Sequence, residues 1–179
     1  YTVDVTGVTG DGTMTLAVAT GSDVKDLAGN ALASSVTSGQ MEIDHTSPTA
    51  AAITPVTASP TSATTVQFTV HFTESVNGFD AAADLVIAET GGLTHSGATI
   101  SGGPQEYTVD VTGVTGNGGA IALAVSTASD VADLAGNPLT SSVTSTAVTI
   151  LWSVPVPLKP GWNLVLFPNA PLVEDAAAL

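Results

Sequence analysis

Two loops of this chain carry the side chains that a hard cation prefers. Each loop places two aspartates three residues apart and an asparagine four residues further on, with a glycine directly before the asparagine. The candidate ligands are Asp130, Asp133 and Asn137 in one loop and Asp23, Asp26 and Asn30 in the other. Calcium takes about six to eight oxygen ligands from carboxylates, carbonyls and water, and a glycine allows the backbone to turn around the ion. The spacing therefore predicts a candidate calcium (Ca2+) site.

One such loop supplies only about half of a calcium shell, so further oxygens are needed. The available carboxylates are those of Asp44, Glu74, Asp80 and Asp84. Lys25 lies inside the first loop and would weaken cation binding there, which favours the second loop. The alternative interpretation is structural: Asp26 and Asp133 accept backbone N–H groups of a tight turn, while the glycine and asparagine adopt left-handed conformations. The sequence leaves both interpretations open.

Catalytic chemistry is poorly provided for. The histidines, His45, His71 and His95, are scattered, and without cysteine they form no recognisable zinc pattern. No Gly-x-Ser-x-Gly motif marks a nucleophile. Aromatic residues make up 4% of the chain and both tryptophans lie near its C-terminal end, so an aromatic-lined glycosidase cleft is hard to build. We therefore predict that the protein is not an enzyme.

The charge balance restricts the partners. The chain has 16 Asp and Glu residues against two lysines and a net charge of −14. Nucleic acids and anionic membrane surfaces are bound by clustered Lys and Arg, which this chain lacks. The longest apolar stretch, residues 150–158, is about ten residues too short to span a bilayer and contains prolines. The sequence predicts no nucleic-acid partner and no membrane insertion.

A long internal repeat organises the chain. The run Tyr1-Thr-Val-Asp-Val-Thr-Gly-Val-Thr-Gly10 recurs unchanged at residues 107–116, and Asp26-Leu-Ala-Gly-Asn30 recurs at residues 133–137. A period of this length is the size of a domain. We expect residues 1–45 to be the C-terminal part of one Ig-like repeat, residues 46–150 a complete repeat, and residues 151–179 a Pro- and Trp-containing tail. The tail would open another β-module or supply a docking strand.

Alternation of apolar and polar residues predicts strands. Clear cases are residues 65–72, 107–111, 121–125 and 146–150, and weaker ones are residues 51–54, 84–88 and 98–101. Turn residues such as Asn77-Gly78 separate them. About seven short strands in about 100 residues predict an all-β chain of tandem Ig-like Greek-key β-sandwiches, one complete and one partial, followed by a short β-rich tail.

The segment Asp44-His-Thr-Ser-Pro48 joins the two repeats. Pro48 fixes its own φ and favours an extended Ser47, so we expect a short, stiff connection. The partial repeat would expose strand edges and an apolar face. Either the chain is a piece of a longer array, or a strand of a neighbouring chain, such as residues 162–167, completes the partial repeat and builds a filament.

Together, several motifs resemble the bacterial immunoglobulin-like (BIg-type) repeats of large secreted adhesins and surface-layer proteins. They are the Tyr-Thr-Val-x-Val-Thr-Gly strand, the Asp-x-Ala-Gly-Asn loop, the Asp-x-Thr-x-Pro joint and Phe72-Thr-Glu-Ser-Val-Asn-Gly-Phe79. The chain departs from the family pattern at His45, which is more often Thr, and at Ser75, which is often Pro. The resemblance covers residues 1–150. It implies a rod-like, surface-exposed stalk, frequently stiffened by calcium, without catalysis.

From residues and resemblance we expect a non-enzymatic extracellular structural or adhesive protein, a rod-like stalk or spacer on a prokaryotic cell surface. The alternatives are a filament subunit and an accessory module of a large secreted hydrolase. Expected partners are neighbouring Ig-like repeats or identical chains, with cell-surface or glycan ligands as further candidates. Trp162 and Phe167 could stack on a sugar, although filling the core of a tail module is the simpler role.

Overall fold

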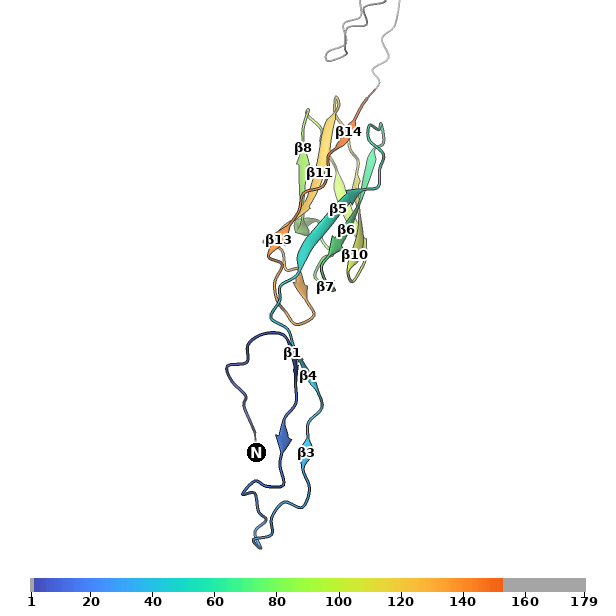
Figure 1. Ribbon diagram of the computed structural model, residues 1–179. Coiled ribbons are helices and arrows are strands. Elements are labelled where there is room, and N and C mark those ends of the chain that lie inside the picture. Colours follow the sequence, from blue (N-terminus) through green and yellow to red (C-terminus); the bar gives the residue numbers. More distant parts are fainter. Residues whose placement is uncertain (1, 153–179) are drawn as a thin grey trace, which may run out of the picture.

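The computed structural model describes residues 2–152 of the chain. Within these residues the fold is all-β, and the only helical element is the short 3-10 turn η1 (Ala82–Asp84). No helix of the described part has the length and apolar character needed to span a membrane. In Figure 1 a two-layered sandwich carries the described N-terminal segment beyond one end, while the last strand of the sandwich leads to the opposite end. The tail predicted for residues 151–179 lies almost wholly outside the described residues.

Two sheets form the sandwich (Figure 1). The five-stranded sheet has the order β13 (Ser141–Ser142), β5 (Thr49–Pro55), β6 (Thr65–Phe72), β10 (Glu106–Thr112) and β9 (Gly97–Gly102). The three-stranded sheet has the order β14 (Val148–Ile150), β11 (Gly119–Val125) and β8 (Leu85–Glu89). The orders β5-β6-β10-β9 and β8-β11-β14 correspond to the ABED and CFG sheets of a constant-type Ig domain. The predicted Ig-like Greek-key sandwich is confirmed.

The core follows from the alternation seen in the sequence. Val66, Phe68, Val70 and Phe72 of β6 are buried, and β10 pairs with β6 in antiparallel register, Val109 lying opposite Phe68. Because successive side chains of a strand point to opposite faces, each strand contributes every second residue to the space between the sheets. Ile121, Leu123 and Val125 of β11 fill that space from the other side. The alternating positions identified the core correctly.

The observed strands differ from the predicted ones mainly at their ends. Strand β14 begins at Val148, two residues later than expected, and β8 begins at Leu85 because Asp84 ends η1. The short ribbon of β7 (Val76–Asn77) and β12 (Ala132–Asp133) was not predicted from the sequence. Strands of two residues are too short to show a period, so only the tertiary fold reveals them.

The N-terminal segment repeats the second half of the sandwich on a smaller scale. Strand β1 (Gly12–Met14) pairs with β4 (Met41–Ile43), and β2 (Ala17–Val18) pairs with β3 (Val36–Thr37). The β1–β4 register, with Gly12 opposite Ile43, is that of Gly119 opposite Ile150 in the β11–β14 pair. The copy relationship seen in the sequence therefore extends to strand pairing.

Candidate functional site at the joint between repeats

Three acidic side chains from separate parts of the chain meet where the repeats join. Glu74 lies in the turn after β6, and Asp133 ends β12, whose pairing with β7 places Asp133 opposite Val76. Asp44 directly follows β4. One carboxylate oxygen from each of Asp44, Glu74 and Asp133 lies within 4.8 Å of the others. The β7–β12 ribbon is thus the element that brings the second loop to the joint.

Asp133 is the buried member of this acidic triad, with 3% of its surface exposed. Its Oδ1 accepts the backbone N–H of Asn137 at 2.8 Å, and its Oδ2 accepts the Asn137 side-chain amide at 2.8 Å. Burial raises the pKa of Asp133, but these hydrogen bonds and those of neighbouring backbone amides outweigh burial, so the net pKa lies below the usual value. An ionised carboxylate has about four lone-pair sites, which leaves room for a cation beside these donors.

The pKa of Glu74 is affected by the other carboxylates of the triad. Burial, followed by the negative charges of Asp44, Asp133 and Asp11, raises its pKa above the usual value. Like charges held this close disfavour ionisation of one another unless a cation lies between them. Electrostatically, this part of the joint is a site at which positive charge would be stabilised.

The second loop also holds the joint by hydrogen bonds. The side-chain amide of Asn137 donates to the backbone oxygens of Asp44 at 3.1 Å and Thr46 at 3.3 Å. Asn137 therefore connects the Asp-x-Ala-Gly-Asn loop of the complete repeat to the segment that leads into it. The connection joins residues more than 90 positions apart in the chain.

The partial repeat holds the joint from the other side. Asp11 accepts the backbone N–H of His45 at 2.7 Å and the hydroxyl of Thr46 at 2.6 Å. The Nδ1 atom of His45 lies 2.9 Å from the backbone oxygen of Gly10. The hydrogen bond from Thr46 is the main reason why the pKa of Asp11 is lowered, followed by that from His45. Residues 44–46 are consequently fastened to both repeats.

The remaining predicted ligands lie elsewhere. Asp84 is buried and accepts the backbone N–H groups of Asp80 and Ala81, which holds η1 in place. Asp130 is exposed and is not among the three carboxylates of the acidic triad. Of the predicted set, the described structure brings together Asp44, Glu74 and Asp133, with Asn137 beside them.

The first loop has the same local turn without the acidic surroundings. Asp26 accepts the N–H groups of Ala28 and Asn30 and the side-chain amide of Asn30. The Asn30 side chain is the largest cause of the lowered pKa of Asp26. Asp23, Asp26 and Asn30 are exposed, and within the described residues they belong to no group of three acidic side chains. Both loops thus have the aspartate hydrogen bonds of the turn interpretation and a glycine, Gly29 or Gly136, with positive φ. Only the second loop adds converging carboxylates.

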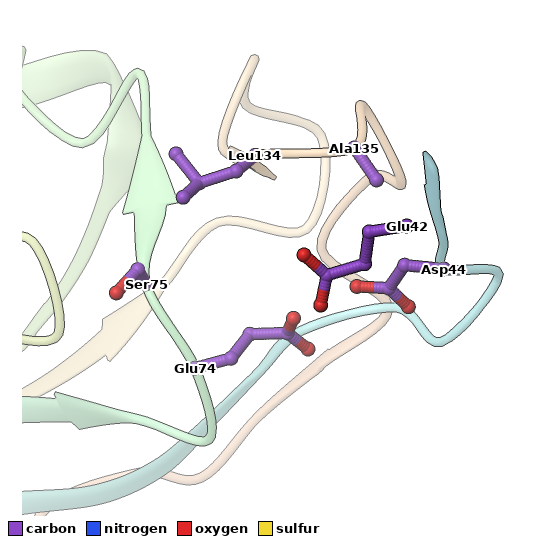
Figure 2. Close-up of a pocket in the computed structure, with 6 residues that line it drawn as sticks. All are labelled: Glu42, Asp44, Glu74, Ser75, Leu134 and Ala135. Atoms are coloured by element: carbon purple, nitrogen blue, oxygen red, sulfur yellow. The ribbon is translucent and has the colours of Figure 1, made fainter. Parts of the chain in front are cut away.

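Two acidic residues of the joint were missed in the sequence. Glu42 lines the same hollow as Asp44 and Glu74, and Figure 2 shows its carboxylate directed into that hollow. Glu42 and Asp44 are two residues apart on extended chain, and that spacing places both on one side. Alignment of the two copies points to Asp11. The same Thr-Gly pair is followed by Asp11 in the partial repeat and by Asn117 in the complete repeat, so both copies carry a side-chain oxygen at this position.

The acidic triad could hold a metal ion. Carboxylates suit hard cations such as calcium, and a calcium shell is commonly completed by backbone oxygens and water. The hollow drawn in Figure 2 is lined by Glu42, Asp44, Glu74, Ser75, Leu134 and Ala135. Three of the six lining residues carry carboxylates, and these are the oxygen ligands that hard cations prefer.

Comparisons with known proteins leave the chain without an assigned family. No protein-family model matches the sequence, and no curated protein matches it. Among solved structures, the N-terminal part of the bacterial S-layer protein SbsC matches with 18% identity and a TM-score of 0.38. The match covers 62% of this chain and 25% of that one. A likeness at this level carries no argument about function, and the relation to bacterial Ig-like repeats stays a resemblance.

Proposed function

We propose that this chain is a non-enzymatic structural spacer of tandem Ig-like sandwiches, exposed on a prokaryotic cell surface, whose joint is stiffened by calcium. The observation that carries the proposal is the double attachment of the joint. Asp11 binds residues 45 and 46 from the preceding repeat, and Asn137 binds residues 44 and 46 from the following one. A connection fastened on both sides transmits direction between domains, as a stalk requires.

Calcium fits this role because of where the acidic triad lies. Asp44 belongs to the joint, whereas Glu74 and Asp133 belong to the complete repeat. An ion shared by them would link the joint to the sandwich and would remove the mutual repulsion that raises the pKa of Glu74. Extracellular modules commonly bind calcium with dissociation constants of about 10⁻⁴–10⁻³ M, a range suited to the outside of cells.

The proposal is tested by the width of an inter-repeat distance distribution. The chain contains no cysteine, so Thr13→Cys in β1 and Thr99→Cys in β9 give two unique spin-label sites. We expect a narrow distribution in calcium and a broader one in chelator. Asn137→Ala should broaden it further, because the joint loses its bonds to the second loop.

The matched control is Asn30→Ala, which removes the same side chain from the loop of the partial repeat. Asn30 bonds to Asp26 of its own loop and has no hydrogen bond to the joint. Its substitution should leave the distance distribution unchanged. Equal broadening by both substitutions, or a distribution that is broad in calcium as well, would contradict a stiff spacer.

A further inference from the structure

The inner face of the partial repeat has apolar side chains that nothing in the described structure covers. Val3 and Leu16 are 62% and 43% exposed, whereas their counterparts in the complete repeat, Val109 and Leu123, are both 0% exposed. The same contrast applies to Val5, Val18, Val24 and Met41 against Val111, Val125, Val131 and Val148. An exposed apolar patch rimmed by polar residues marks an interaction surface.

The contrast is largest at positions that face the core. Leu27 and its counterpart Leu134 are exposed in both copies, as are Val36 and its counterpart Val143, although these two side chains are also more exposed in the partial repeat. The side chains that change from buried to exposed are those whose counterparts belong to the core of the complete repeat.

The partial repeat shares local structure with the second half of the complete repeat. The backbone N–H of Leu16 donates to Ser38 Oγ at 2.9 Å, as that of Leu123 donates to Ser145 Oγ at 3.0 Å. Both copies also share the β1–β4 and β11–β14 register. The uncovered side chains form a groove whose lining includes Val3, Asp4, Val5, Met14, Leu16 and Met41.

The complete repeat shows what such a groove accepts. There β6 lies antiparallel to β10, with Phe68 opposite Val109 and Val66 opposite Val111. Gln67 adds a polar contact, because its side-chain amide donates to Asp110 Oδ1 at 2.8 Å. Asp4 is the counterpart of Asp110 and lines the open groove. A strand that fits the open groove therefore has apolar side chains at every second position and an amide donor between two of them.

We propose that the groove is an acceptor for the N-terminal half of a further repeat of this type, with its β6-like strand antiparallel to residues 2–6. The inference rests on the proposed tandem-repeat function. The β6–β10 interface is the template for the contact, since residues 2–6 repeat the sequence of residues 108–112. The adjoining β1–β4 ribbon also repeats the register of the β11–β14 pair. Exchange of β6 between identical chains cannot fill every groove. Each β6 that enters the groove of another chain would leave β10 of its own chain uncovered.

The test extends the 179-residue chain by its own sequence. Residues 46–106 are placed directly before Tyr1, which restores the junction that Glu106 and Tyr107 form in the complete repeat. Residues 2–6 form no strand in the described structure, so their amides should exchange rapidly with solvent. In the extended chain we expect exchange at residues 3 and 5 to slow by about 100-fold or more, since these amides join a sheet.

The control extension carries Phe68→Asp and Val70→Asp in the added copy only, which removes its apolar anchors and should leave exchange at residues 3 and 5 rapid. Equal exchange in the two extended chains would overturn the proposal. Amide exchange in the unextended chain distinguishes two other occupants. Protection of residues 3 and 5 that increases with protein concentration would assign the groove to a second copy, as in a filament. Protection that is the same at every concentration would assign it to residues 153–179. Either result overturns the proposal.

This readout is independent of the joint. A flexible joint with protected residues 3 and 5 would contradict the stiff spacer and leave the acceptor groove standing. A stiff joint with unprotected residues would do the reverse.

Discussion

At the scale of single residues, Asp133 and Asp26 show that equal local sequence does not make equal sites. Both carboxylates accept the amide groups of an asparagine four positions later. Asp133 additionally lies beside Asp44 and Glu74. The turn is encoded within five residues, whereas the acidic surroundings depend on residues far away in the chain. Substitutions in the two loops should therefore affect the turn alike and the response to cations differently.

The pH dependence of Glu74 follows from its raised pKa. A carboxyl group whose pKa is higher in the folded state contributes stability below its unfolded value of about 4.5, and that contribution is lost as the pH rises through the raised pKa. At neutral pH the ionised Glu74 therefore opposes folding when no cation is present. We expect Glu74→Gln in chelator to raise Tm at pH 7 and to have no effect near pH 3, as measured by calorimetry.

Asp133 has the opposite sign and serves as the internal comparison. Its pKa is lowered, so its contribution is present above the unfolded value of about 3.8 and is lost as the pH falls through the lowered pKa. Asp133→Asn should lower Tm at pH 7, where Glu74→Gln raises it. The same direction of change for both variants would contradict the electrostatic description of the acidic triad.

At the scale of elements, β6 is the strand on which the sandwich most depends. It lies between β5 and β10, and its four apolar side chains are buried. Phe72 also packs edge-to-face against Phe79 and Tyr107. Tyr107 donates its hydroxyl to the backbone oxygen of Val76 at 3.1 Å, which ties β10 to β7. Core and site thus share elements, because β7 in turn positions β12.

The substitution Phe68→Ala tests how much β6 contributes to the stability of the sandwich. Phe68 is fully buried between the sheets, and removing a buried phenylalanine side chain costs about 3–5 kcal/mol of unfolding free energy. Urea denaturation should show this loss as a lower midpoint with an unchanged slope. The matched control is Val86→Ala on β8, an exposed position where a change of about 0.5 kcal/mol or less is expected. Similar losses at both positions would contradict the core described above.

At the scale of the whole molecule, net charge and the acidic triad make separable contributions. The chain carries −14 with only two basic residues. Self-repulsion of this kind is screened by salt, as the Debye length falls from about 30 Å at 0.01 M to about 8 Å at 0.15 M. Sodium chloride should therefore raise Tm for the native chain and for Glu74→Gln alike.

Calcium should stabilise the chain by more than the screening of its net charge explains. At constant ionic strength, calcium at about 100 times its dissociation constant would stabilise the native chain by about 2.7 kcal/mol. Glu74→Gln should lose most of that increment while keeping the response to sodium chloride. Magnesium at equal concentration is the control cation, because it accepts irregular carboxylate sites less readily. A calcium response equal to that of magnesium, or unchanged in Glu74→Gln, would contradict a specific site.

The sequence alone was sufficient for the longer strands of the complete repeat and for their inner faces. The alternation in residues 65–72 and 107–111 reflects which side chains must avoid water, and this information is local. It also offered the two Asp–Asn turns as one of two open interpretations of the loops. It also limited the ligand candidates at the joint to a short set of carboxylates, although Glu42 and Asp11 escaped notice.

Only the tertiary structure decided which of those carboxylates meet. Asp44, Glu74 and Asp133 come together because a ribbon of two-residue strands sets β12 beside the end of β6, and such short strands leave no period in the sequence. The same limit applies to the open groove of the partial repeat. Val3 and Val109 stand in matching sequence contexts, and their burial differs because only one of them has a strand across from it. Burial is a property of partners in space, which local sequence does not specify.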